Sequence, residues 1–351
     1  MINNKKVEKI NILYTKSIEK FWHLVGHSVD LPSKNSYKCI NIGRYKLFLY
    51  KTNKEIKAFL NQCPHRGALI FNNDKGIAPL TCPYHGWTFT PKKTFVPKLE
   101  TYQNNLDPQK ARLITWNVEV RSGFIYIAKD PEFSLEEQLG EEVLNIINKI
   151  GSSIKKCESI QKLTYKANWL ISVENSLELL HVATVHPKSL NELNLEDCID
   201  KLWNWAFLVT AKPQNKRISN LSKNLKKGIS SNIDINGYWS LSLFPFSQIS
   251  TTEGISFAIQ TFHPGEDPLI EKTDFCTTLY SPRLKDNTIG NSLKFFYDSV
   301  TDLNYKVFKE DAEICSYLPL GSWDFFSSKY SSSLEIKVNH FRECCRKVIN
   351  L

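Results

Sequence analysis

The chain has 351 residues, of which 42% are hydrophobic and 23% are charged, and its formal net charge is +9. Such a length predicts two domains or one large domain, with ample apolar residues for a core. Because the sequence contains no run of eighteen apolar residues and no apolar segment after its first residues, we expect neither a membrane-spanning helix nor a secretory signal. These features predict a cytoplasmic protein with no membrane partner.

The basic residues are spread along the chain, and lysine greatly outnumbers arginine. Aromatic residues do not alternate with arginine as they do on nucleic-acid-binding surfaces, so we predict no nucleic-acid partner. The same positive charge would attract an acidic redox partner. Nine cysteines lie at irregular spacings, which is typical of reduced thiols in a reducing compartment.

The first part of the chain reads as a lead-in followed by a small β domain. Residues 1–36 are mostly polar and form the predicted lead-in. From residue 37 onward apolar residues alternate with a period of two, and residues 114–128 have the pattern of a hairpin. We therefore predict a small antiparallel β domain over residues 37–130.

Two short loops in this domain carry paired cysteine and histidine residues. The first loop, CPHRG, holds Cys63 and His65, and the second, CPYHGW, holds Cys82 and His85. Two thiolates and two imidazoles are the ligand set of a Rieske [2Fe-2S] cluster, in which the cysteines hold one iron and the histidines the other. The same four residues could also hold a tetrahedral zinc ion.

Residues 131–351 read as a second, larger domain. A helical pattern over 131–151 has Ser134 as its N-cap, and strand-like runs are followed by two long helical patterns. This order predicts an α+β domain in which helices cover one face of an antiparallel sheet. The segment 213–236, rich in Lys, Ser and Asn, is predicted to be a mobile insertion. The predicted strands are 161–165, 203–211, 238–244, 254–262 and 272–280, and the predicted helices are 292–317 and 333–349.

The stretch from 168 to 187 holds a second group of polar residues. On a helix, Glu178 and His181 would share a face, and Asn175 would lie one turn earlier. His186 is five residues beyond His181, so a helix would have to end or bulge between them for both imidazoles to meet one ion.

Two histidines and one carboxylate form the triad that holds Fe(II) with open positions for O₂ and substrate. The best candidate for the carboxylate is the Glu310-Asp311 pair on the predicted helix 292–317, because a buried acid there would otherwise be unpaired.

These motifs together resemble the large subunit of Rieske non-haem iron oxygenases, over nearly the whole chain from Trp22 to Phe341. Respiratory Rieske proteins carry an extra disulfide-forming cysteine in each loop, where this chain has Ala68 and Tyr84. The glutamate at position 178 resembles the residue found at that place in the group that includes choline and carnitine monooxygenases. The matching pieces are the two loops, the Asn-Trp…Glu-Asn…Glu-x-x-His-x₄-His stretch, Glu310-Asp311 with Cys315, and Glu335 with His340-Phe341.

The resemblance implies a fold and a set of cofactor ligands. The fold would be α+β, with a small antiparallel Rieske [2Fe-2S] domain at 37–130 and a larger helix-grip-like catalytic domain at 131–351. Glu178 and Asn175 would be the catalytic residues, and Glu178 would bridge to a cluster histidine of a neighbouring subunit in a head-to-tail homotrimer. The implied cluster ligands are Cys63, His65, Cys82 and His85, and the implied ligands of the mononuclear Fe(II) are His181, His186 and Asp311.

The resemblance also implies an activity. A separate flavin and iron-sulfur reductase would pass electrons from NAD(P)H to the cluster, and O₂ would hydroxylate a small-molecule substrate. We expect a quaternary ammonium or N-methyl compound, because strand aromatics could provide cation–π contacts, and an aromatic or terpenoid substrate is the alternative. These aromatics are Trp203, Trp205, Tyr238, Trp239 and Phe244.

Two features leave other interpretations open. Ser316 and Pro319 stand where relatives commonly have Glu and Gln, and we expect Pro319 to reshape the edge of the pocket. The chain could also be a Rieske electron-transfer protein with an inactive second domain, although the intact Glu178, His181, His186 and Asp311 argue against that.

Overall fold

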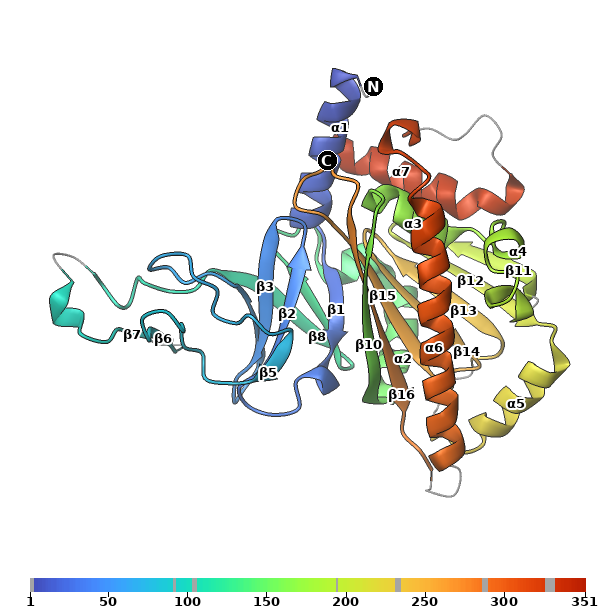
Figure 1. Cartoon of the computed structure of the whole chain (residues 1–351), viewed down its shortest axis with the longest axis horizontal. Helices are drawn as coiled ribbons and strands as arrows, with labels where there is room; N and C mark the ends of the chain where they lie inside the picture. The colour runs from blue at the N-terminus through green and yellow to red at the C-terminus, as the bar shows by residue number, and fades with distance from the viewer. Residues whose placement is uncertain are drawn as a thin grey trace.

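Two seven-stranded antiparallel sheets lie side by side in the molecule (Figure 1). The structure is a computed structural model, and it describes residues 3–90, 93–102, 106–193, 195–230, 235–285, 290–325 and 332–351. None of the described helices is both long and apolar enough to cross a membrane.

The first sheet is built mostly from the predicted β domain. Its strands follow the order β1-β9-β8-β4-β3-β2-β5, and β8 and β9 form the hairpin predicted at 114–128. Strand β1 belongs to residues 1–36, yet it pairs with β9 and forms an edge of this sheet. The strands are β1 (His23–His27), β2 (Ser36–Ile42), β3 (Tyr45–Lys51), β4 (Ile56–Leu60), β5 (Lys75–Ile77), β8 (Thr115–Arg121) and β9 (Phe124–Ala128).

The second sheet is larger and comes entirely from residues after 153. Its order is β10-β16-β15-β14-β13-β12-β11, and every neighbouring pair is antiparallel. The strands are β10 (Ile154–Tyr165), β11 (Leu195–Leu202), β12 (Ala206–Pro213), β13 (Tyr238–Leu243), β14 (Ser247–Thr252), β15 (Phe257–Pro264) and β16 (Thr273–Pro282).

Helices lie on both faces of the second sheet, not on one face as the sequence predicts. Helices α3 (Trp169–Leu177) and α6 (Gly290–Cys315) pack on one face, where α6 runs along β10 (Figure 1). Helix α2 (Leu135–Ser153) covers the opposite face and packs its apolar residues against both sheets. Ser134 caps α2 as predicted, because its side chain accepts from the backbone N–H of Glu137 while the Glu137 carboxylate accepts from the backbone N–H of Ser134.

The first and last helices of the chain pack against each other. Helix α1 (Asn4–Glu19) contacts α7 (Ile336–Asn350), and the buried faces of both join one large apolar core. The predicted mobile insertion at 213–236 contains helix α5 (Lys216–Lys226), which has Leu225 buried; residues 231–234 of that segment lie outside the described residues. The prediction rested on the polar composition of this segment, although the apolar residues Ile218, Leu221 and Leu225 recur with helical spacing.

Candidate metal centres

The two cysteine and histidine loops close with the same backbone hydrogen bonds. The Cys63 N–H donates to the Ala68 carbonyl at 2.8 Å, and the Gly67 N–H donates to the Cys63 carbonyl at 2.9 Å. In the second loop Cys82 and Gly86 repeat both bonds, at 2.8 Å to the Trp87 carbonyl and 3.0 Å to the Cys82 carbonyl.

A glycine ends each of these turns for a conformational reason. Gly67 has a φ of 75° and Gly86 a φ of 71°, a left-handed conformation that side chains with a Cβ rarely adopt. The repeated turn therefore presents a cysteine at the same place in both loops.

The cysteines of these loops are buried and the histidines face the surface. Cys63 and Cys82 are 2% and 1% exposed, whereas His65 and His85 are half-buried with ring centroids 4.7 Å apart. The Trp87 ring stacks on His65 at 4.8 Å. Both thiols are free and adjacent, so one end of the site offers two sulfurs and the other two imidazoles. This donor set fits a [2Fe-2S] cluster with its histidine end toward the surface.

The second site begins where helix α3 ends. Asn168 caps the start of α3 through the backbone N–H of Leu170, and the helix stops at Leu177, before Glu178. The prediction that Glu178 and His181 share a helix face is therefore wrong. Glu178 has an extended backbone. Its carboxylate accepts hydrogen bonds from the backbone N–H groups of Leu180 and His181, which follow it in the chain.

A single helical turn, α4 (Val182–Val185), separates the two histidines. His181 precedes this turn and His186 follows it. The helical path therefore breaks before His181 as well as at His186, and both imidazoles can face Asp311 on α6. Between the two histidines the chain is helical, and this turn ends at His186.

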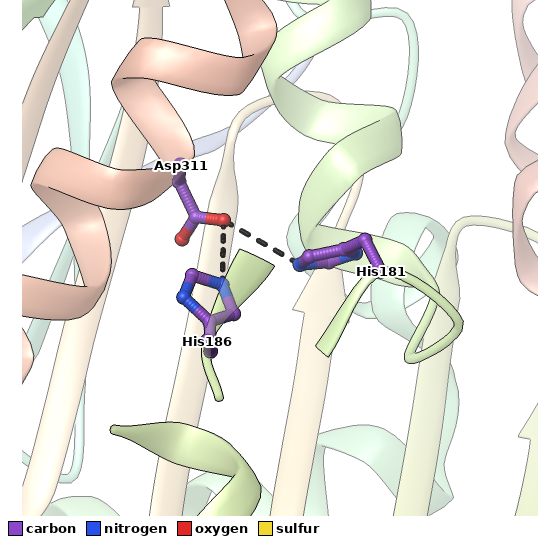
Figure 2. Close-up of side chains that lie close together, drawn as sticks. All are labelled: His181, His186 and Asp311. Atoms are coloured by element: carbon purple, nitrogen blue, oxygen red, sulfur yellow. Dashed lines mark hydrogen bonds and ion pairs between the residues drawn. The ribbon is translucent and has the colours of Figure 1, made fainter. Parts of the chain in front are cut away.

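The three predicted iron ligands meet in one place (Figure 2). The His186 Nε2 lies 3.0 Å and the His181 Nε2 3.5 Å from the same oxygen, Oδ1 of Asp311. One ligand atom from each residue lies within 4.8 Å of the others, and this is the one such group of three found in the described part of the chain. Two imidazoles and one carboxylate converging in this way fit the two-histidine, one-carboxylate site of Fe(II).

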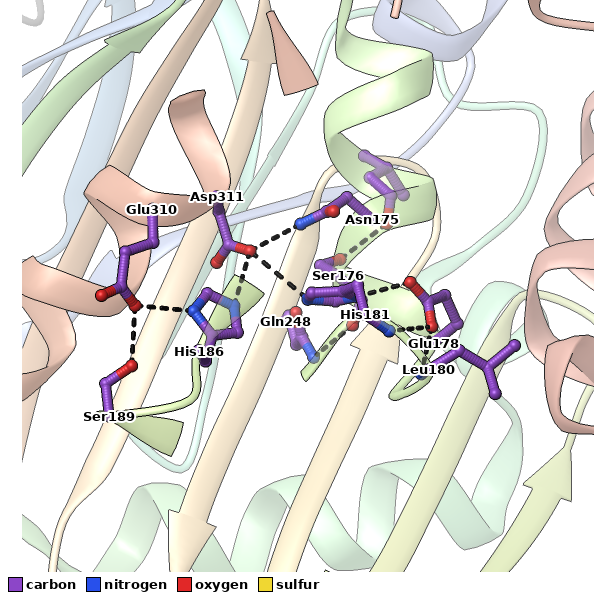
Figure 3. Close-up of polar contacts among 11 residues, drawn as sticks. Asn175, Ser176, Glu178, Leu180, His181, His186, Ser189, Gln248, Glu310 and Asp311 are labelled. Atoms are coloured by element: carbon purple, nitrogen blue, oxygen red, sulfur yellow. Dashed lines mark hydrogen bonds and ion pairs between the residues drawn. The ribbon is translucent and has the colours of Figure 1, made fainter. Parts of the chain in front are cut away.

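The Nδ1 atom of each imidazole contacts a further carboxylate, and this carboxylate differs between the two rings (Figure 3). His181 Nδ1 contacts Glu178 Oε1, and His186 Nδ1 lies 2.8 Å from Glu310 Oε2. Ser189 Oγ donates to the same Glu310 oxygen at 2.7 Å. Such contacts fix the ring orientation and leave the Nε2 atoms for a metal. From the sequence, Glu310 was only an alternative to Asp311 as the iron ligand. In the structure it contacts the Nδ1 atom of His186 instead.

Asn175 lies in the same network. Its Nδ2 donates to Asp311 Oδ1 at 2.8 Å. Burial would raise the pKa of Asp311, but hydrogen bonds with His181 and His186 outweigh it and hold that pKa below its usual value. Burial alone would lower the pKa of His181, but its contacts with Asp311 and Glu178 raise that pKa to about 9. Both shifts arise because the Asp311 carboxylate and the His181 imidazole stabilise each other's charged forms.

A cavity of about 70 Å³ adjoins the three converging residues. Four aromatic residues and two glutamines contribute to its wall, and its charged lining residues apart from the histidines are Glu178 and Asp311. Sequence patterns gave no indication of the glutamines. These wall residues are Tyr165, Tyr238, Phe262, Phe308, Gln248 and Gln260.

Of the five strand aromatics expected around the substrate, Tyr238 alone lines this cavity. Trp205 and Phe244 lie in the core, each packed against Phe21. The Trp203 indole N–H donates to Glu142 at 3.0 Å, and the Trp239 indole N–H donates to the Asn236 carbonyl at 3.2 Å.

Ser316 and Pro319 also lie outside the cavity wall. Ser316 Oγ donates to the Glu313 carbonyl just beyond the end of α6, and Pro319 precedes the short turn Leu320–Ser322. Their departure from the pattern of relatives therefore does not change the wall beside the three converging residues.

Comparisons with known proteins identify relatives of both parts of the chain. Residues 21–106 match the model of the Rieske [2Fe-2S] domain. The chain is 29% identical over 275 residues to the carnitine monooxygenase oxygenase subunit of Escherichia coli K12, covering 74% of this chain and 69% of that protein. It is 30% identical over 177 residues to the toluate 1,2-dioxygenase alpha subunit of Pseudomonas putida, covering 47% of this chain and 39% of that protein.

The fold extends the similarity to almost the entire chain. A crystal structure of a quaternary ammonium Rieske monooxygenase with L-carnitine superposes with a TM-score of 0.74 at 18% identity, covering 99% of this chain and 93% of that one. The predicted α+β fold with a Rieske domain is confirmed.

Proposed function

Because the chain is a Rieske oxygenase large subunit related to the carnitine monooxygenases, we propose that it hydroxylates a small organic substrate. O₂ supplies the oxygen atom, and electrons come from NAD(P)H through a separate flavin and iron-sulfur reductase. The observation that carries this proposal is the convergence of His181 Nε2, His186 Nε2 and Asp311 Oδ1 beside a cavity. An inactive electron-transfer relic would not be expected to keep that arrangement.

We assign the cofactors to the two donor sets. Cys63, His65, Cys82 and His85 hold the [2Fe-2S] cluster, and His181, His186 and Asp311 hold Fe(II). When bound, the cluster supplies single electrons and the ferrous iron supplies the site of O₂ reduction. The match to a Rieske domain favours the cluster over zinc in the first site.

Glu178 is the proposed link between the two sites. Its Oε1 contacts His181 and its side chain is partly exposed, so it can also reach a group outside this chain. We propose that this group is a cluster histidine of a neighbouring subunit in a homotrimer with a closed head-to-tail interface.

The proposed substrate is a quaternary ammonium or N-methyl compound. Carnitine monooxygenases are among the relatives, and aromatic residues, which attract cations, line the cavity beside the proposed iron site. Hydroxylation of an N-methyl group consumes O₂, two electrons and two protons and gives an N-hydroxymethyl product and water; that product then breaks its C–N bond to release formaldehyde and the amine. The relationship to toluate dioxygenase keeps an aromatic substrate as the second candidate.

A single turnover tests the function. The iron-loaded protein is reduced chemically under anaerobic conditions and then mixed with O₂ and either N-methylated ammonium compounds or aromatic acids. We expect an ammonium compound to accelerate reoxidation of the cluster, with formaldehyde or another oxygenated product formed in proportion. Cluster reoxidation that no substrate accelerates, with no oxygenated product, would overturn the assignment as an oxygenase.

A further inference from the structure

Two aromatic rings, those of Trp87 and Tyr102, pack against the imidazole of His65. The Trp87 ring stacks on it in parallel, with an interplanar angle of 3° and ring centroids 4.8 Å apart. The Tyr102 ring meets it edge to face, at 73° and 5.6 Å. The Trp87 indole N–H donates to the Tyr102 hydroxyl at 3.2 Å, so the two rings also hold each other in place.

Tyr102 reaches His65 from a segment that follows both cysteine and histidine loops. The chain leaves β7 (Thr94–Phe95), on the side of the molecule away from the second sheet (Figure 1), and makes the short turn Leu99–Thr101. Tyr102 ends this turn and donates its backbone N–H to the Leu99 carbonyl at 3.1 Å. Its half-buried side chain packs against the apolar core that contains Cys63 and Cys82. The contact with His65 is therefore built into the folded domain.

The second imidazole of this site has a different environment. The His85 ring stacks on Tyr84, with centroids 3.9 Å apart, and Tyr84 is 58% exposed. Trp87, in contrast, is 2% exposed, and Tyr102 is half-buried. The rings that cover His65 therefore belong to the domain core, whereas the ring beside His85 lies open to water.

Apolar cover on a cluster ligand affects the charge that the cluster can carry. In an oxidised Rieske cluster the charges of two ferric ions, two sulfides and two thiolates cancel when both imidazoles are neutral, and one added electron leaves a single negative charge. Water stabilises that charge, and burial disfavours it. Solvent exposure is accordingly one of the factors that set the reduction potential of iron-sulfur clusters. Cover over His65 thus lowers the potential.

We propose that Tyr102 keeps the reduction potential of the cluster low by covering the His65 imidazole and excluding water from that side. Tyr102 is a positioning residue, because it acts through His65. The inference rests on the proposed [2Fe-2S] assignment and adds to it a residue outside the two loops. A lower potential makes the reduced cluster a stronger donor of its one electron, so Tyr102 increases the driving force for transfer to the iron site.

Redox titration of the purified, cluster-loaded protein, followed by visible circular dichroism, tests the proposal. In Tyr102→Ala we expect the ratio of reduced to oxidised cluster at a fixed solution potential to rise about threefold or more, which is about 28 mV for a one-electron couple. In Tyr102→Phe the ring remains, so this ratio should stay within about 1.5-fold of the unmodified protein. An unchanged or lower ratio in Tyr102→Ala, or equal shifts in the two variants, overturns the proposal.

Phe95→Ala is the matched control, because Phe95 lies on β7 in the same segment and is 60% exposed. We expect its potential to equal that of the unmodified protein, and a shift as large as in Tyr102→Ala would overturn the specific role of Tyr102. If Tyr102→Ala does not retain the cluster, Tyr102→Leu decides in the same way, since leucine keeps apolar packing but covers less of the imidazole.

Electron spin-echo spectroscopy of the reduced protein in D₂O measures the exclusion of water itself. The deuterium signal from exchangeable hydrogens near the cluster should grow in Tyr102→Ala and should not grow in Tyr102→Phe. A signal of equal strength in Tyr102→Ala and the unmodified protein would show that Tyr102 shields nothing, and would overturn the proposal even if the potential moved.

The unmodified protein separates this inference from the proposed function. A protein that binds zinc at Cys63, His65, Cys82 and His85, and no [2Fe-2S] cluster, overturns the cluster assignment and the inference with it. A [2Fe-2S] cluster whose potential does not respond to Tyr102→Ala overturns the inference alone and leaves the oxygenase function intact.

Discussion

Glu310 and Asp311 are consecutive in the chain, and their carboxylates contact opposite nitrogens of one imidazole. Glu310 Oε2 lies 2.8 Å from Nδ1 of His186, and Asp311 Oδ1 lies 3.0 Å from its Nε2. Two consecutive residues of α6 therefore have different roles. Asp311 is a proposed iron ligand, and Glu310 orients His186, a second proposed iron ligand.

Removal of the orienting carboxylate should weaken the iron site. In Glu310→Ala we expect the affinity for Fe(II) at the second site to fall by about 10–100-fold, because His186 loses the contact that fixes its ring. Glu310→Gln keeps an acceptor and should recover part of the loss. Iron per chain after dialysis against a graded chelator, with the visible absorbance of the cluster recorded in parallel, measures the effect.

Glu313→Ala is the control for this measurement, because Glu313 lies on the exposed side of the same helix. An iron affinity in Glu310→Ala equal to that of the unmodified protein would show that His186 needs no such support.

The charge on Glu178 should matter for electron transfer and not for metal binding. Glu178→Gln keeps an oxygen for the backbone N–H groups of Leu180 and His181 but removes the negative charge. We expect both metals to stay bound while substrate-dependent reoxidation of the cluster slows roughly tenfold or more. Stopped-flow absorbance of the reduced protein mixed with O₂ and substrate measures the rate; an unchanged rate would sink the bridge assignment.

A buried ion pair ties the helix before the iron site to the end of the chain. Glu174 on α3 accepts from Arg342 on α7 at 2.7 Å and 2.8 Å and from the Trp323 indole at 2.8 Å. Burial raises the pKa of Glu174 despite these contacts. Arg342→Met leaves this carboxylate buried and unpaired, so we expect the free energy of unfolding to drop by about 3–5 kcal/mol.

Urea unfolding of two further variants separates charge from packing. The double variant Glu174→Gln with Arg342→Met should recover much of the loss, since no charge is then buried. Lys347→Met, on the more exposed side of α7, should change little. A double variant as unstable as Arg342→Met alone would assign the effect to packing.

Two buried histidines predict a loss of stability in mild acid. Burial lowers the pKa of His23 to about 4; burial, with a further contribution from nearby His23, lowers that of His263 to about 3. In the unfolded chain both titrate near 6.5, so between pH 6.5 and about 4 the unfolded state binds more protons than the folded state. The free energy of unfolding should therefore fall as the pH drops through this range.

Comparison of the unmodified protein with His263→Gln tests the cause. We expect the free energy of unfolding, measured with urea at pH 7.0, 6.0 and 5.0, to decline less steeply in the variant, by about 1 kcal/mol per pH unit below pH 6. Parallel declines in the two proteins would contradict a contribution from His263.

The sequence predicted those parts of the sites that are local in the chain. Each cluster histidine lies two or three residues from its cysteine, so spacing alone indicated the loops. Asp311 lies 125 residues beyond His186, and the choice of Asp311 over Glu310 came from family resemblance. Glu178 and His181 do meet as expected, but through a turn after α3, because the carboxylate bonds backbone N–H groups that a helix would have used.

Gln248 and Gln260 show what local patterns could not predict. Their position follows from the register of β14 with β15 and from the packing of α3 and α6 over that face. The prediction that strand aromatics surround the substrate was mostly wrong for the same reason. Strand alternation assigns Trp203 and Trp205 to one face of a strand, but it does not say which helix or cavity that face contacts. Tyr165, which does line the cavity, lies at the end of a strand predicted without any site role.

The contact between α1 and α7 affects how the protein is made. The apolar residues Ile10 and Leu13 of α1 belong to the same core as Phe341 and Val348 of α7, more than 300 residues later. During synthesis on the ribosome α1 leaves the exit tunnel long before α7 exists, so part of its apolar face stays exposed to solvent until translation is nearly finished. Nascent chains are therefore a natural target for chaperones, and slower growth at low temperature should increase the yield of folded protein.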